Sequence, residues 1–158
     1  MKRDDFKNAA ECWKVILSDV KRNANLLNEI RRFTMENSTP TDVVFGTSGW
    51  RGETGTDFTF NNVRIVTTAI IEMFKTGGQK VTESLGVKDF DEVKRRGVIV
   101  GHDNRFLGPE FASSVMGLLT KEGIKVYYAA EATTPEFSAA IDMLHAACSI
   151  NLTPSHNP

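Results

Sequence analysis

The chain has 158 residues, enough for one domain whose hydrophobic core needs neither a metal ion nor disulfides. Its 41% hydrophobic and 25% charged residues are typical of soluble globular proteins, and no apolar run is long enough to cross a bilayer. The formal net charge of −1 argues against nucleic acid or an anionic membrane as a partner. The sequence has no recognisable signal peptide, and Cys12 and Cys148 lie far apart. We therefore expect a cytoplasmic protein with reduced thiols.

Residues 1–40 predict a helical extension and a linker. Apolar residues recur at helical spacing from Phe6 to Val20 and again from Leu26 to Phe33. Asn23 and Asn25 indicate a break between two helices, which predicts a helical hairpin, and one long helix is the alternative. We expect this extension to brace the rest of the chain or to form an oligomer contact.

Residues 41–158 predict alternating strands and helices. The expected strands are Val43–Phe45, Gly97–Gly101, Lys125–Ala129 and Ala146–Leu152. The expected helices follow a cap at Asn61, Pro109 in a first turn, and Thr134 as a cap before Pro135, with one or two short helices in Gln79–Arg96. This order predicts an α/β fold, a three-layer α/β/α domain with a mostly parallel four-stranded sheet, preceded by the helical hairpin.

The last predicted strand leads into Thr153-Pro154-Ser155-His156-Asn157-Pro158. Pro154 and Pro158 lie on either side of Ser155, and each proline fixes its own φ at about −65°. The Ser155 hydroxyl is therefore expected at the carboxyl end of a strand, where open α/β sheets bind ligands. An ordinary proline turn is the alternative interpretation. The sequence lacks the GxSxG motif of acyl-transfer enzymes and the glycine-rich motifs of nucleotide-binding proteins.

Upstream residues are of the kind that bind phosphate. Gly46-Thr47-Ser48-Gly49 offers hydroxyl donors and a backbone that an anion can approach closely. Arg51 and Arg105 have guanidinium groups that can bind phosphate through two hydrogen bonds. Asp103 and Arg105 form either a structural ion pair or part of the phosphate contact, and the sequence leaves both alternatives open.

Four segments carry a family resemblance. In chain order they are Phe45-Gly46-Thr47-Ser48-Gly49-Trp50-Arg51-Gly52, Gly101-His102-Asp103-Asn104-Arg105, Thr134-Pro135-Glu136 and the serine segment. Together they resemble the α-D-phosphohexomutases, the phosphoglucomutase and phosphomannomutase superfamily, from Val43 to Pro158. The resemblance implies that residues 41–158 are the first of four domains and end at the active-serine loop. The later domains of the same polypeptide are then its partners, and the isolated chain is expected to be inactive.

The resemblance also implies the chemistry. Ser155 is the residue that is phosphorylated, His156 beside it is catalytic, and Asn157 binds substrate together with Thr47, Ser48, Arg51 and Arg105. The phosphoryl group passes from Ser155 to a hexose phosphate, giving a bisphosphate that returns its other phosphate to the serine. One Mg²⁺ per full-length enzyme is expected to bind an oxygen of the Ser155 phosphate, with its other ligands outside this chain.

The expected substrate is glucose 1-phosphate or glucose 6-phosphate, with mannose phosphate as the alternative and glucose 1,6-bisphosphate as activator and intermediate. Thr-Pro-Ser in place of Thr-Ala-Ser is similar to some bacterial phosphoglucomutases. Phosphoglucosamine is less favoured, because Thr47-Ser48-Gly49-Trp50 lacks the aspartate usual in that group. A non-catalytic module that binds sugar phosphates or another protein is the alternative function.

Overall fold

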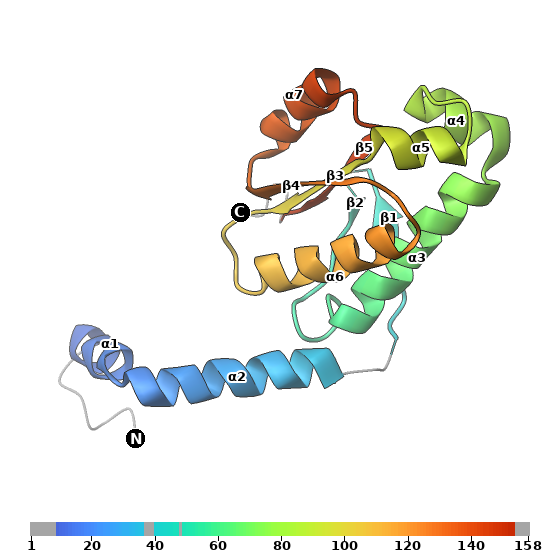
Figure 1. The fold of residues 1–158 in the computed structure, drawn as a ribbon. Helices are drawn as coiled ribbons and strands as arrows, with labels where there is room; N and C mark the ends of the chain where they lie inside the picture. The colour runs from blue at the N-terminus through green and yellow to red at the C-terminus, as the bar shows by residue number, and fades with distance from the viewer. Residues whose placement is uncertain (1–8, 37–39, 48, 154–158) are drawn as a thin grey trace.

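A parallel sheet of three strands lies at the centre of the fold in the computed structural model, which describes residues 9–36, 40–47 and 49–153 (Figure 1). Strand β3 (Val98–His102) lies between β4 (Val126–Glu131) and β5 (Cys148–Leu152). Val98 is aligned with the first residue of each neighbouring strand. All five residues of β3 are buried, as expected for a central parallel strand with both faces covered.

Helices pack on both faces of this sheet (Figure 1). The helices are α1 (Ala9–Ser18), α2 (Val20–Glu36), α3 (Phe60–Thr76), α4 (Gly78–Leu85), α5 (Phe90–Arg96), α6 (Gly108–Lys121) and α7 (Thr134–Leu144). Val98 and Val100 face the larger core cluster with α3 and α6, whereas Ile99 faces a smaller cluster with α7. This alternation follows from the two-residue period of a strand. The predicted three-layer α/β/α class is confirmed.

Most predicted helices are confirmed, although two begin at a different cap. Gln79–Arg96 forms the two short helices α4 and α5, and Pro109 lies in the first turn of α6 as predicted. The cap of α3 is Thr59 rather than Asn61, and its hydroxyl oxygen accepts a 3.2 Å hydrogen bond from the backbone N–H of Asn62. The cap of α7 is Thr133 rather than Thr134.

The predicted fourth strand does not join the main sheet in the part of the chain described. Instead β1 (Phe45–Gly46) pairs antiparallel with β2 (Gly49–Trp50) in a separate two-stranded ribbon. The turn between them leads into Gly49, whose φ of 105° favours glycine. Val44 and Phe45 are 74% and 58% exposed, so this apolar run does not gain the burial that a central strand would give.

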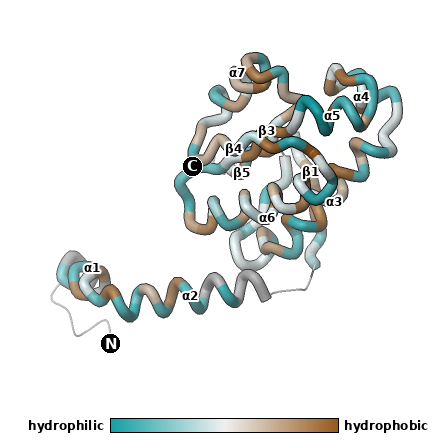
Figure 2. The backbone as a smooth tube through the Cα atoms, in the orientation of Figure 1, coloured by the Kyte–Doolittle hydropathy of each residue, from teal (hydrophilic) through white to brown (hydrophobic). Residues whose placement is uncertain are grey.

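The N-terminal segment forms two helices, as predicted, but the break lies at Asp19 rather than near Asn23 and Asn25. The Asp19 carboxylate accepts a 3.0 Å hydrogen bond from the backbone N–H of Arg22 and so caps α2. Helix α2 projects away from the sheet and carries α1 at its far end, with apolar and polar residues alternating along it (Figure 2). Val20 and Leu27 remain 75% and 48% exposed, so α2 does not brace the sheet along its length. The oligomer contact stays a prediction. None of the helices in the described ranges combines the length and apolar character that a membrane span needs.

Candidate functional site

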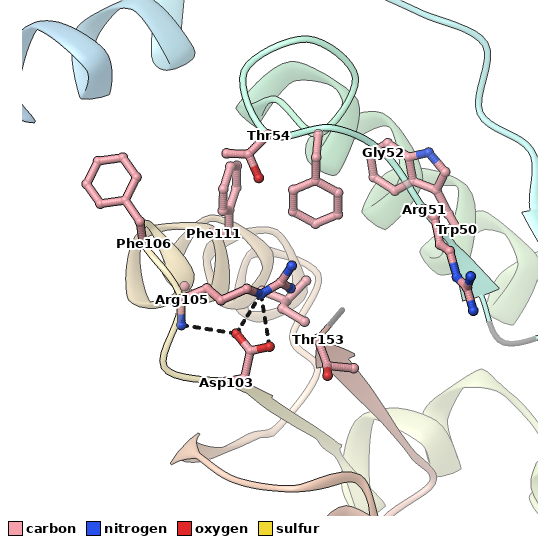
Figure 3. A pocket seen from close by; sticks show the side chains of 12 residues that line it. Trp50, Arg51, Gly52, Thr54, Asp103, Arg105, Phe106, Phe111 and Thr153 are labelled. Carbon is pink, nitrogen blue, oxygen red and sulfur yellow. Dashed lines mark hydrogen bonds and ion pairs between the residues drawn. The ribbon is translucent and has the colours of Figure 1, made fainter. Parts of the chain in front are cut away.

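A small pocket opens at the carboxyl end of the sheet, where three segments meet (Figure 3). Trp50 ends β2 and is followed by Arg51 and Gly52, residues 103–106 form the loop after β3, and Leu152 ends β5 and is followed by Thr153. The pocket has a volume of about 80 Å³, compared with roughly 300–1,000 Å³ for a typical small-molecule site. The pocket is therefore too small to enclose a whole sugar phosphate.

The loop after β3 holds Arg105 by an ion pair with Asp103 (Figure 3). The Arg105 Nε donates to both carboxylate oxygens, at 3.0 and 2.9 Å, and the Arg105 backbone N–H donates to the same carboxylate at 3.1 Å. Within the described chain, no hydrogen bond uses the terminal nitrogens Nη1 and Nη2 of this arginine. The predicted ion pair is therefore present, and it leaves the two-nitrogen end of the guanidinium for an anion.

Arg51 lies at the same pocket, on the segment that leaves β2. Its neighbour Trp50 stacks on Phe58, with ring centroids 4.8 Å apart, and Phe58 meets Phe111 of α6 edge to face at 5.0 Å. Phe111 in turn stacks on Phe60 at the start of α3. This aromatic row, which the motif-based prediction missed, anchors the arginine-bearing segment to the hydrophobic core.

The end of β5 and the residue after it reach the pocket. Leu152 and Thr153 line the pocket, and the carbonyl oxygen of Leu152 accepts a 3.1 Å hydrogen bond from the backbone N–H of Asp103. Of the other predicted site residues, Thr47 is exposed in the turn of the β1–β2 ribbon and is not part of the pocket lining. Ser48, Ser155, His156 and Asn157 lie outside the described residues.

His102 packs against the loop that follows β3. It is the last residue of β3, it is 6% exposed, and its ring lies between the Asp103 carbonyl and the Tyr128 hydroxyl. His102 lies in one of the four sequence segments that carry the family resemblance. Tyr128 carried no comparable signal, because its contact depends on the pairing of β3 with β4.

The residues around the pocket do not fit a magnesium site by themselves. Across the part of the chain that is described, no three carboxylate, imidazole or thiol groups lie together as metal ligands. Asp103, the acidic residue at the pocket, is already paired with Arg105. The expected Mg²⁺ therefore stays a prediction that depends on the Ser155 phosphate and on ligands beyond these residues.

Comparison with known proteins shows which family the chain resembles. Residues 42–158 match the family model described as phosphoglucomutase/phosphomannomutase, alpha/beta/alpha domain I. A phosphoglucomutase of Staphylococcus haemolyticus is 32% identical over 121 residues, which are 75% of this chain and 20% of the relative. A probable phosphoribomutase of Schizosaccharomyces pombe is 31% identical over 72% of this chain and 18% of its own length. A phosphoglucosamine mutase of Leuconostoc mesenteroides is 30% identical over 72% of this chain and 23% of its own length.

The chain thus spans about a fifth of the length of these curated relatives. No solved structure matches it significantly.

Proposed function

The chain belongs to the phosphoglucomutase/phosphomannomutase family through its α/β/α domain I, and from this premise we propose that it carries the phosphate-bearing serine of a phosphohexomutase. The proposed reaction moves a phosphoryl group between C1 and C6 of a hexose phosphate. The Ser155 phosphoryl group passes to the free sugar hydroxyl: the serine Oγ–P bond breaks as the sugar O–P bond forms, and the hydroxyl proton of the sugar ends on the serine Oγ. The resulting bisphosphate then transfers its other phosphoryl group to Ser155.

The observation that supports this proposal is the meeting of Arg51, Arg105 and Thr153 at one pocket. Thr153 lies two residues before Ser155 in the chain. A phosphoserine carries a charge of about −1.5 to −2 near neutral pH and needs cationic donors nearby. Guanidinium groups bind phosphate oxygens in pairs, and Arg105 is oriented with both terminal nitrogens available.

We infer that these residues serve the transferred phosphate and that other segments select the sugar. The pocket of about 80 Å³ has room for one charged group, and the relatives are named for glucose, ribose and glucosamine phosphates. Glucose phosphate is the proposed substrate, with glucose 1,6-bisphosphate as intermediate and the cytoplasm as the location. A metal ion, the sugar-selecting loop and a second phosphate site are proposed for the later domains of the longer protein.

The experiment is phosphorylation of Ser155 in the protein expressed from its complete reading frame. After incubation with glucose 1,6-bisphosphate, mass spectrometry should find one phosphate on Ser155, and the Ser155→Ala protein should carry none. Mutase activity of the Ser155→Ala protein should fall by at least about a thousandfold, as for loss of a covalent nucleophile. Ser138→Ala, which changes an exposed serine of α7, is the matched control and should behave as wild type.

A phosphate found on a different residue would contradict the proposal. Phosphorylation of Ser155 without turnover of any hexose phosphate would instead favour the non-catalytic sugar-phosphate-binding module.

A further inference from the structure

Each ring nitrogen of His102 forms one hydrogen bond with a neighbouring segment. Its Nδ1 lies 2.6 Å from the carbonyl oxygen of Asp103, and its Nε2 lies 2.9 Å from the hydroxyl oxygen of Tyr128. Because a carbonyl oxygen only accepts, Nδ1 carries the hydrogen and donates it. In the neutral ring Nε2 then accepts from the tyrosine O–H. The result is a chain of hydrogen bonds from Tyr128 on β4, through the imidazole, to the backbone of the pocket loop.

The residue held by His102 is the one that orients the arginine. The Asp103 carboxylate accepts the Nε–H of Arg105, and the Asp103 backbone N–H is bonded to Leu152 of β5. The carbonyl side of the same residue is fixed by the histidine. Each polar group of Asp103 thus has a partner, and the bond from His102 is the one that holds its carbonyl.

We propose that His102 is a positioning residue for Arg105: through the Asp103 carbonyl it sets the carboxylate that aims the guanidinium at the pocket. Tyr128 supports it by fixing the ring. The positioning of Arg105 by His102 is argued from this geometry alone. The claim that the positioned guanidinium binds phosphate rests on the proposed function.

The packing around the imidazole agrees with this role. Gly108 lies against the ring, and a Cβ placed there would be 2.9 Å from Nδ1 and 3.0 Å from the Asp103 carbonyl oxygen. Leu107 has a φ of 65°, a region that disfavours residues with a Cβ, yet its side chain is 2% exposed. Burial therefore holds the loop in a strained conformation that closes over His102, as is common at functional sites.

The test uses ¹⁵N-labelled protein and follows the Nε–H signal of Arg105 by NMR. Its exchange rate with water reports the bond to Asp103, and titration with inorganic phosphate reports the affinity of the pocket. His102→Leu removes both hydrogen bonds, whereas His102→Asn keeps a donor near the position of Nδ1. Tyr128→Phe removes one hydroxyl, and Tyr127→Phe, one residue earlier on β4, is its matched control.

His102→Leu should speed Nε–H exchange and weaken phosphate binding, each by about fivefold or more, the effect expected for one lost hydrogen bond. His102→Asn should restore both to within about twofold of wild type. Tyr128→Phe should give a smaller increase in exchange, and Tyr127→Phe should give none.

Wild-type exchange in a folded His102→Leu protein would overturn the proposal, as would equal losses in the leucine and asparagine variants. If His102→Leu does not fold, indistinguishable exchange in Tyr128→Phe and Tyr127→Phe would overturn it. If wild type binds no phosphate while exchange still depends on His102, the positioning role is supported and the proposed phosphate site fails.

Discussion

Arg96 connects the end of α5 to the turn that follows α7, because its Nε donates a 2.8 Å hydrogen bond to the carbonyl oxygen of His145. Its terminal nitrogens donate to the carbonyls of Gly86 at 2.6 Å and Ala146 at 2.9 Å. Gly86 and His145 are the left-handed residues that end α4 and α7, where carbonyl groups lack partners within the helix. One side chain therefore joins the ends of three helices on the side opposite the pocket.

Replacing Arg96 with lysine should lower the free energy of unfolding by about 1–2 kcal/mol, because an ammonium group cannot reach three carbonyls in this planar arrangement. Chemical denaturation measures the change. Arg95→Lys is the control: that side chain is 72% exposed and pairs with Glu92 on the surface, so the expected change is within about 0.5 kcal/mol. Equal losses in the two variants would contradict the role given to Arg96.

Arg51 and Arg105 should differ in their effect on stability. Arg51→Ala should weaken phosphate binding by about tenfold with little change in melting temperature, because the side chain is exposed. Arg105→Ala should weaken binding similarly and also lower the melting temperature by about 2–4 °C, because Asp103 loses its ion pair. Calorimetric titration with phosphate and thermal melts measure both effects, with Arg64→Ala on α3 as the control. The same fall in melting temperature for both pocket arginines would contradict this division.

Two glycines of α6 should respond in opposite directions to alanine. Gly117 lies inside the helix with no atom within 4 Å of an added Cβ, so Gly117→Ala should raise stability by about 0.5–1 kcal/mol. Gly108→Ala should lower stability, because its Cβ would meet the His102 ring and the Asp103 backbone. Denaturant midpoints measure both changes. A stabilising Gly108→Ala would show that the loop can move away without loss.

The Glu136 carboxylate should stabilise the fold near neutral pH and lose this contribution in acid. The backbone N–H and hydroxyl of Thr133 donate to its carboxylate at 2.6 and 2.8 Å, and these bonds lower the pKa of Glu136 below the ordinary 4.5. Since the folded pKa lies below the unfolded one, the contribution is complete above about pH 4.5 and is lost as the pH falls through the folded value. Glu136→Gln should therefore melt lower than wild type at pH 6, and the gap should close towards pH 3. A gap independent of pH would contradict this, and Glu131→Gln is the control.

Cys148 should be unreactive while the protein is folded. Burial in β5 raises the pKa of its thiol to about 11, so little thiolate is present near neutral pH. In a Cys12→Ser background, alkylation by iodoacetamide at pH 8 should be about a hundredfold slower than in denaturant. Mass spectrometry measures both rates. Similar rates in the two conditions would mean that this end of the sheet opens readily.

Local patterns predicted the helices well, because their signals lie in adjacent residues. Pro109 and the apolar spacing after it define α6 without reference to the rest of the chain. The predicted start of α3 was wrong, because Asn61 has a residue type that favours a cap although Thr59 is the residue that caps the helix. The position of the cap depends on Asn62, which is fully buried. Its side chain donates to the Thr41 hydroxyl, which is distant in sequence, and to the Asp57 carbonyl in the turn before the helix.

The same division between local and distant contacts explains what the sequence revealed of the site. Arg51 and Arg105 were predicted because each lies in a short motif, and both line the pocket. The apolar run Val43–Phe45 was assigned to the main sheet because period and composition do not specify which strand is its partner. The bond between His102 and Tyr128 was equally hidden, because it depends on the parallel register of β3 and β4, which shifts between Val100 and Gly101.

The loop at residues 103–106 begins with a residue that is still hydrogen-bonded to the sheet. These hydrogen bonds limit how fast the start of the loop can move. The Asp103 amide is bonded to Leu152, and the His102 carbonyl accepts from the Ala132 amide. These amides should exchange their hydrogens as slowly as those of the buried strand, through unfolding rather than through local fluctuation. Faster motion can begin only at Asn104. Asp103 therefore ends the rigid part of the site, and rapid motion is expected only in the loop residues after it and in the exposed end of the Arg105 side chain.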